Sequence, residues 1–191
     1  MSNFSDYKPH GVSSHPQPER FTIRPAAISD VPELALIKSS REGTDLNSCA
    51  RGFAEEISRN GNSYLLLTAS IGTKIAAFGR AGFFQRPESI SQNTAPEGWY
   101  LLGVIVLKDF RRCGIAFELT RSRLLWIADH SKVAYYFASA MNLATIHLHN
   151  HFGFSEITRD FTFPGVTFTG GTGILFRAEL NEKRIQNCAR S

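Results

Sequence analysis

The chain has 191 residues, of which 42% are hydrophobic, and carries a formal net charge of +4, which predicts one domain with a sizeable core. No stretch reaches the roughly 18 apolar residues that a membrane span needs, and the chain does not open with a basic segment followed by an apolar one, so we expect a cytoplasmic protein with no membrane partner. The basic residues are scattered, without a block of like charges, which argues against nucleic acid and favours an anionic cofactor.

Residues 1–20 combine Ser, Pro, His and Gly with almost no apolar residues. They predict a flexible N-terminal arm, because so little apolar surface cannot offset the entropy of ordering. Apolar and polar residues alternate over 21–25, which predicts a first strand. A helix follows that Ser29 or Asp30 can cap, with Glu33 three residues after Asp30 as a capping-box partner. Its expected apolar face consists of Val31, Leu34, Ala35 and Ile37.

The next elements are short and bounded by turns. Residues 49–60 predict a second helix that ends at an Asn-Gly-Asn turn. Residues 64–69 and 75–84 are apolar runs that predict two strands, joined as a hairpin through 70–73. The segment 85–98 is polar and contains two prolines, so it predicts a loop.

An unbroken apolar run, WYLLGVIVL, spans 99–107 and predicts a central strand covered on both faces. A helix over 116–129 follows, and its inward stripe is expected to contain Ala116, Leu119, Arg123, Trp126 and Ile127. The remaining predicted elements are a strand at 133–139, a helix at 142–152 before the C-cap signal Gly153, strands at 157–163 and 173–180 joined by the glycine-rich 164–172, and a polar C-terminal tail at 181–191. The fold class is therefore mixed α/β, with one domain over 21–180.

The spacing of the cysteines argues against disulfide bonds and a structural metal site. Cys49, Cys113 and Cys188 are widely spaced and form no CxxC pair and no cluster with histidine at zinc spacing. Neither disulfides nor a bound metal is expected.

The segment 111–116, Arg-Arg-Cys-Gly-Ile-Ala, lies between the predicted central strand and a helix. Backbone N–H groups and the positive end of the helix dipole converge at such a turn. Gly114 has no side chain to keep a phosphate away, Ala116 is small, and Arg111 and Arg112 add charge-assisted contacts. The pattern predicts a pyrophosphate-binding loop, with a basic turn that merely begins a helix as the alternative.

Two ordered motifs resemble those of the GNAT superfamily of N-acetyltransferases. The segment 104–116 (VIVLKDFRRCGIA) looks like motif A of that superfamily. Asn142 followed by 145–154 (TIHLHNHFGF) is similar to motif B, and 21–26 (FTIRPA) matches the opening strand and helix. The resemblance covers 21–180.

The resemblance implies the GNAT fold, with a mixed sheet splayed between its fourth and fifth strands and helices on both faces. It also implies acetyl-CoA as co-substrate, with pantetheine bonded to the fourth strand, the pyrophosphate on 111–116, and Asn142 beside the thioester. Asn142 is equally suited to cap a helix, and the two roles are compatible. The residues expected to bind acetyl-CoA are Val104, Ile105, Val106, Arg111, Arg112, Cys113, Gly114, Ile115, Ala116 and Asn142.

Acetyl transfer to an amine requires a base for the amine proton, donors for the oxyanion and an acid for the leaving thiolate. The resemblance implies backbone N–H groups near Ile105 or Val106 as the oxyanion donors. It also implies a tyrosine where this chain has His149, and since histidine donates a proton near neutral pH, we expect His149 to be the general acid. A histidine at a helix end can instead interact only with the helix dipole. The strand 99–107 lacks the glutamate that many members carry, so the nearest carboxylate, Glu97, is the candidate base, with a water chain as the alternative.

The acceptor is expected to meet a wall built from the loop 85–98 and the aromatic, glycine-rich 161–173. Trp99, Phe163 and Phe168 can hold a ring or sugar, although each can equally pack in the core. The segment 163–180 resembles a branch linked with 2'-N-acetylation of kasugamycin-like aminoglycosides, which implies a small-molecule amine acceptor and antibiotic resistance. Acidic residues available to a cationic acceptor are Glu55, Glu56, Glu97 and Asp160.

Two other functions stay open at this point: a protein or peptide N-acetyltransferase, and a non-catalytic module that binds acetyl-CoA. The sequence also leaves the oligomeric state open, a homodimer included.

Overall fold

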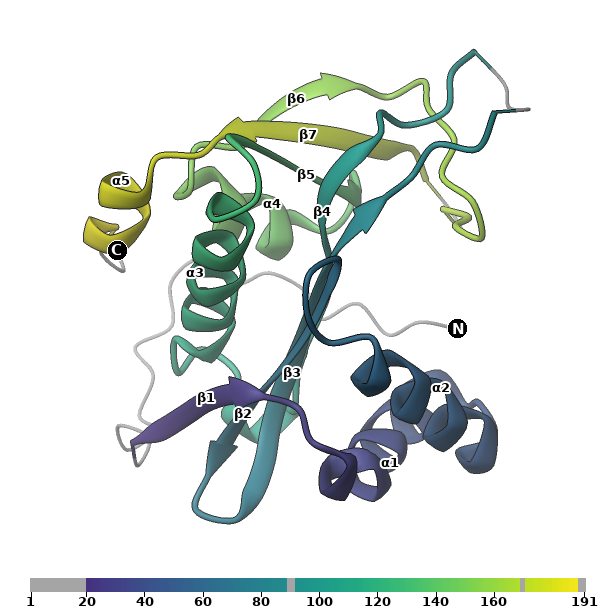
Figure 1. Cartoon of the computed structure of the whole chain (residues 1–191), viewed down its shortest axis with the longest axis vertical. Helices are drawn as coiled ribbons and strands as arrows, with labels where there is room; N and C mark the ends of the chain where they lie inside the picture. The colour runs from purple at the N-terminus through teal and green to yellow at the C-terminus, as the bar shows by residue number, and fades with distance from the viewer. Residues whose placement is uncertain (1–19, 89–91, 169–170, 189–191) are drawn as a thin grey trace. The chain divides into compact units, whose positions relative to one another are not determined.

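The computed structural model describes residues 20–88, 92–168 and 171–188. The chain has a mixed α/β fold around a seven-stranded sheet with the strand order β1-β2-β3-β4-β5-β7-β6 (Figure 1). Short 3₁₀ turns occupy Ile28–Asp30 and Lys108–Phe110. The helices and strands are β1 (Phe21–Pro25), α1 (Val31–Glu42), α2 (Leu46–Ser58), β2 (Tyr64–Ile71), β3 (Lys74–Phe84), β4 (Gly98–Val106), α3 (Ile115–Ala128), β5 (Val133–Ser139), α4 (Leu143–Asn150), β6 (Ser155–Thr158), β7 (Gly173–Glu179) and α5 (Glu182–Asn187).

The predicted fold class and order of elements are confirmed, while the bounds of two elements are corrected and one further helix is present. The second helix begins at Leu46, because the Asp45 carboxylate caps it by accepting a hydrogen bond from the Ser48 N–H at 2.7 Å. The strand predicted at 157–163 is instead β6, which ends at Thr158. The C-terminal tail contains the short helix α5, which the polar sequence did not reveal. The arm predicted for 1–20 lies outside the described residues, Arg20 excepted.

Asp30 begins α1, but its carboxylate does not form the expected capping box. It accepts hydrogen bonds from both terminal nitrogens of Arg24, at 2.6 and 2.8 Å, and from the Ala27 N–H at 2.8 Å. These bonds to Arg24 and Ala27 outweigh the effect of burial and hold the pKa of Asp30 below its usual value. Glu33 accepts from the Ile75 N–H at 2.9 Å instead, so it joins α1 to β3.

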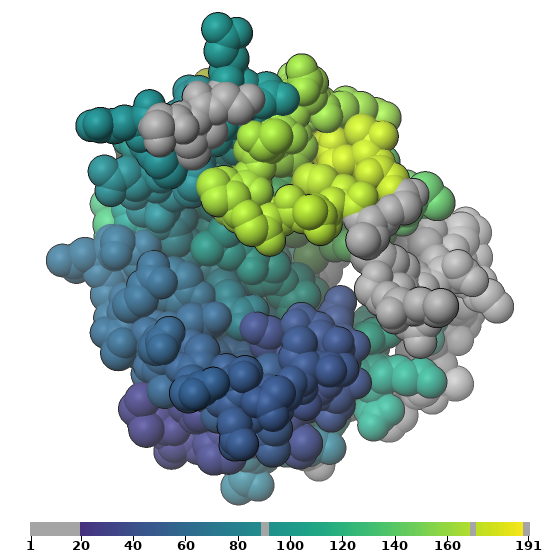
Figure 2. Space-filling view, turned by 90° about the vertical axis from the view of Figure 1, so that its right-hand side faces the viewer, coloured from purple at the N-terminus to yellow at the C-terminus, as the bar shows by residue number. Residues whose placement is uncertain are grey.

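The described residues divide into two compact units, each made of two chain segments. The first unit contains the residues up to Ala81 together with Gly103–Arg123. In this unit β1 and β2 are antiparallel, and α1 packs against α2, which together form a continuous area of surface in Figure 2, coloured purple to blue. The core includes Phe53 and Phe78, whose rings meet edge to face at 5.3 Å.

The second unit contains Gly82–Leu102 and the residues from Leu124 onward. Here β5 pairs antiparallel with β7 along its whole length, and Tyr100 of β4 lies opposite Tyr135 of β5 in a parallel pair. Because side chains alternate along a strand, Tyr136 packs on one face with Phe154 and Phe176, while its neighbours on β5 belong to the other face. No helix of the described residues is long and apolar enough to cross a membrane.

Candidate active site

The predicted phosphate loop connects β4 to α3 within the first unit. Val106 ends β4, the 3₁₀ turn follows, and α3 begins at Ile115. Arg111 and Arg112 are exposed, whereas Ile115 is buried and anchors the first turn of the helix. Arg111 donates from Nε to the carbonyl of Val106 at 3.2 Å, which folds the loop back onto the end of the strand.

Two residues of the loop have a left-handed backbone conformation. Arg112 has a φ of +62° and Gly114 a φ of +80°, and Arg112 is the one non-glycine residue with a positive φ in the described parts of the chain. A non-glycine residue in this region costs of order 1–2 kcal/mol, and such outliers cluster at functional sites. The loop leads into the N-terminus of the 14-residue helix α3, where the first backbone N–H groups and the helix dipole favour an anion. The donor set therefore suits a pyrophosphate group.

The second half of β4 differs from the expectation that the strand is covered on both faces. Gly103 is exposed, and Val104, Ile105 and Val106 are only half-buried. Gly103 also has a φ of +92°, a backbone conformation that a side chain would strain. The strand that leads into 111–116 is thus partly accessible and has one residue in an unusual backbone conformation, neither of which the apolar run predicted.

In the second unit, Asn142 caps α4. Its Oδ1 accepts a hydrogen bond from the Thr145 N–H at 3.2 Å, so the capping role considered from the sequence is present. The proposed contact of Asn142 with acetyl-CoA remains a prediction.

His149 lies on α4 and is only 3% exposed. Its Nδ1 lies 2.8 Å from the carbonyl oxygen of Thr145. Because a carbonyl oxygen can only accept a hydrogen bond, Nδ1 carries the hydrogen of this bond, and Nε2 is the ring nitrogen that takes no part in it. The ring stacks on Tyr136 at a centroid distance of 4.0 Å and meets Phe154 edge to face. The orientation of His149 is therefore fixed by packing, and its role as general acid remains a prediction.

Tyr136 was not singled out by the sequence. Its hydroxyl is buried, has no hydrogen-bond partner among the described residues, and burial raises its pKa. It lies in the same aromatic stack as His149, between that ring and Phe176.

The candidate base and the acidic residues are dispersed. Glu97 is exposed and accepts a hydrogen bond from the Arg86 N–H at 3.1 Å. Asp160 accepts from the side-chain amide of Asn93 at 2.9 Å, and both of these acidic residues belong to the second unit. Glu55 is exposed on α2 of the first unit.

The three aromatic residues proposed for the acceptor do not form one group. The Trp99 ring packs against Phe83, Trp126 and His130 at centroid distances of 4.7 to 5.4 Å. Phe163 and Phe168 instead both contact Phe137, at 4.7 and 6.0 Å. The two groups separate because Trp99 and its neighbour Tyr100, which also contacts Phe163, point to opposite faces of β4.

No group of three or more metal-ligating side chains occurs in the described residues. Backbone N–H groups and arginines of 111–116 are donors that suit an anionic cofactor.

With this geometry in place, the comparisons with known proteins identify the class. The model of the acetyltransferase (GNAT) family matches residues 32–154, which is more than half of the chain. The chain belongs to the acetyltransferase (GNAT) family and is an acetyl-CoA-dependent N-acetyltransferase. No protein with curated functional information matches the sequence.

Solved structures share the fold at low sequence identity. YncA from Salmonella typhimurium, determined with its cofactor acetyl-CoA, is 18% identical, with a TM-score of 0.61 over 85% of this chain and 95% of that one. Ribosomal-protein-alanine N-acetyltransferase from Brucella melitensis is 21% identical, with a TM-score of 0.63 over 83% and 99%. A GNAT-family acetyltransferase from Streptococcus pneumoniae is 16% identical, with a TM-score of 0.61 over 84% and 100%.

The structure also draws attention to Arg123, which the sequence predicted only as part of the inward stripe of a helix. Arg123 falls on the inward stripe of α3, and it is fully buried. A charged residue at a core position of an amphipathic helix was the available signal, because arginine is almost never buried completely without a specific partner.

Proposed function

We propose that this acetyltransferase acetylates an amine of a small cationic molecule, with kasugamycin-type aminoglycosides as the acceptor class. The observation that carries the proposal is the folded wall that 160–168 and 92–97 build together in the second unit. The backbone N–H of Ala95 donates to Thr162 O, and the N–H of Thr162 donates to Asn93 O, both at 2.9 Å.

Aromatic packing fixes this wall. Phe163 contacts Phe84, Tyr100 and Phe137 at centroid distances of 4.5, 5.3 and 4.7 Å. Phe161 and Phe168 are in contact with each other and remain half-buried, and the yellow-green segment that carries them lies at the surface in Figure 2. Half-buried aromatic faces on a fixed loop support recognition of a ring or sugar rather than an extended peptide backbone.

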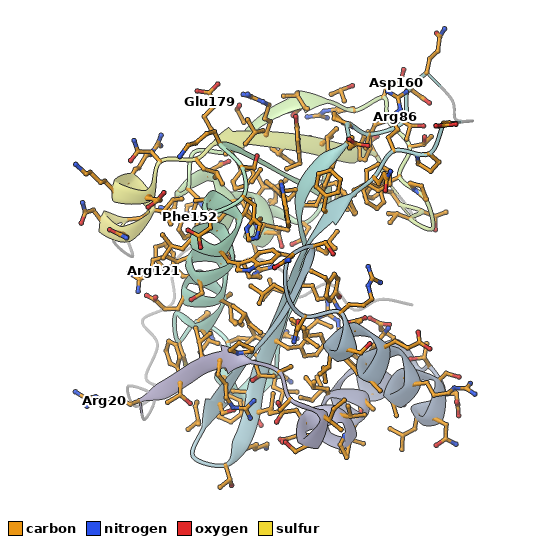
Figure 3. All side chains as sticks on the ribbon, in the orientation of Figure 1. Arg20, Arg86, Arg121, Phe152, Asp160 and Glu179 are labelled. Carbon is orange, nitrogen blue, oxygen red and sulfur yellow. The ribbon has the colours of Figure 1, made fainter. Side chains whose placement is uncertain are left out.

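The charges of the wall support a cationic acceptor. Glu97 and Asp160 are exposed carboxylates on its two segments, and Figure 3 labels Asp160 and Arg86, the residue whose N–H Glu97 accepts. Each carboxylate is oriented by a hydrogen bond to a neutral donor and retains lone pairs for an ammonium group. A polycationic aminoglycoside matches this arrangement.

Phosphate-loop residues 111–116 and the strand backbone 104–106 are proposed to hold acetyl-CoA. The amine loses a proton and its nitrogen attacks the thioester carbon, which forms the C–N bond and places negative charge on the acetyl oxygen. Collapse of this intermediate breaks the C–S bond, and the departing thiolate takes up a proton. His149 is proposed to supply that proton, and Glu97 or a water chain to accept the one from the amine.

A protein N-terminal acceptor is the second candidate. It is favoured by the likeness in fold to the Brucella melitensis protein, which by its name acts on an alanine of a ribosomal protein. At 21% identity this likeness extends to the fold alone, so the wall described above decides our preference.

The proposal is tested by thiol release from acetyl-CoA with three matched sets of acceptors: aminoglycosides including kasugamycin, simple diamines, and peptides that begin with alanine. We expect aminoglycosides to give the highest kcat/KM and a product heavier by one acetyl group. Higher kcat/KM with the peptides would establish the second candidate, and acetyl-CoA binding without thiol release for any acceptor would contradict both.

A further inference from the structure

Arg123 is a buried cation that forms no ion pair with any carboxylate in residues 20–88, 92–168 and 171–188. Its side chain lies on α3 in the first unit and is 0% exposed. Burial, together with the nearby charge of Arg80, lowers the pKa of Arg123 to about 9, so the guanidinium stays charged at neutral pH. Arg80 itself is paired with Glu56 at 2.6 Å, so the uncompensated charge is that of Arg123.

Neutral oxygen atoms satisfy the guanidinium in place of a carboxylate. Nε donates to Leu119 O at 3.0 Å and Nη2 donates to Thr120 Oγ1 at 3.0 Å. Nη1 donates to two strand carbonyls, Arg80 O of β3 at 2.8 Å and Gly103 O of β4 at 3.0 Å. Burying a charge without a counter-charge is costly, so its retention at a core position calls for a functional reason.

The space for this guanidinium is built into β3. A Cβ placed on Gly79 would lie 3.0 Å from Nε and 3.1 Å from Cζ of Arg123. The absence of a side chain at this position is therefore what admits the guanidinium between α3 and the strands.

The contact with Gly103 is made at the residue of β4 that has a positive φ. In a planar trans peptide the C=O and the following N–H point in opposite directions, so the Val104 N–H points away from Arg123. A charged donor on the carbonyl polarises the peptide group and strengthens its N–H as a donor, because hydrogen bonds in series reinforce one another. Gly103 itself has a φ of +92°, so this peptide follows a residue in a conformation that a side chain would strain.

We propose that Arg123 is a positioning residue for acetyl transfer, which holds and polarises the Gly103–Val104 peptide so that the Val104 N–H stabilises negative charge on the acetyl oxygen. The inference rests on the proposed placement of acetyl-CoA along 104–106. It adds to that placement a specific donor, the Val104 N–H in place of those near Ile105 or Val106 that the resemblance implies, and the buried charge that activates it.

Infrared spectroscopy of bound acetyl-CoA labelled with ¹³C at the acetyl carbonyl tests this role without any acceptor. We expect the carbonyl band at lower wavenumber in the wild-type protein than in Arg123→Met, because the polarised N–H lengthens the C=O bond. Arg121→Met is the matched control on the same helix. Arg121 pairs with Glu118 at 2.5 Å, and its side chain extends away from the helix in Figure 3. The carbonyl band of acetyl-CoA bound to this variant should equal that in the wild-type protein.

Steady-state kinetics with the best acceptor provides the second readout. Arg123→Met should lower kcat by about tenfold or more and leave the acetyl-CoA dissociation constant within about threefold, since the Val104 N–H binds the negative oxygen of the transition state more strongly than the carbonyl of bound acetyl-CoA. Gly79→Ala, which retains the charge but displaces the guanidinium, should lower kcat in the same direction and serves as the second variant if Arg123→Met does not fold.

The outcomes distinguish the role of Arg123 from the placement of acetyl-CoA along 104–106. An identical carbonyl band in folded wild type and variants, all with acetyl-CoA bound, would overturn the role of Arg123 alone. Failure of the wild-type protein to bind acetyl-CoA would overturn the proposed cofactor site, and this inference with it.

Discussion

The proposal that 111–116 bind the pyrophosphate of CoA leads to a quantitative prediction at Gly114. Its φ of +80° lies in the left-handed region, where an alanine is less stable by about 1–2 kcal/mol. In Gly114→Ala the free loop relaxes away from this conformation, and binding of the pyrophosphate must restore it. If the whole strain energy of about 1–2 kcal/mol opposes binding, the affinity for CoA falls by roughly 5- to 30-fold.

The matched control is Gly72→Ala, in the turn between β2 and β3. Gly72 has a φ of +57°, and a Cβ there would meet nothing within 4 Å, so the variant has a similar backbone strain without a role in the loop. Isothermal titration with CoA measures both variants, and thermal unfolding reports their stability. Equal CoA affinity of the two variants, with similar losses of stability, would refute the assignment of 111–116 as the pyrophosphate site.

Three further variants test other parts of the account. His149→Phe retains the stacking on Tyr136 and should lower turnover with little change in acetyl-CoA affinity; unchanged turnover would remove His149 from the mechanism. Phe163→Ala should raise KM for the acceptor more than KM for acetyl-CoA, and an equal change in both would indicate a packing role alone. Asp30→Asn should reduce the free energy of unfolding by about 1–3 kcal/mol at pH 7, because it weakens a paired and hydrogen-bonded carboxylate. Since the pKa of Asp30 is lowered on folding, this difference between the two proteins should vanish as the pH falls through that pKa, and a difference that persists in acid would contradict the assignment.

The order of elements and the position of 111–116 between a strand and a helix were predictable because both depend on local patterns. Each of these features is recognised from residues that are close together in the sequence: the apolar run of β4, the apolar stripe of α3, and the small residues at 114 and 116. The same local reading placed Asn142 at a helix start, where its side chain caps α4.

Contacts between residues far apart in the chain could not be predicted from the sequence. Asp30 was expected to cap a helix through its own first turn, but Arg24 on β1 competes for its carboxylate. Arg123 was assigned to an apolar stripe by its spacing, and only the approach of Arg80 O and Gly103 O explains how a charge is tolerated there. Trp99 was grouped with Phe163 by composition, although strand alternation sends its ring to another cluster.

Mass spectrometry of an aminoglycoside panel incubated with the protein and acetyl-CoA is the decisive test of acetyl transfer to a small cationic amine. We expect a product heavier by one acetyl group and an equal amount of free CoA thiol, both reduced in Gly114→Ala at limiting acetyl-CoA. Acetylation of alanine-terminated peptides with no acetylated aminoglycoside would contradict it.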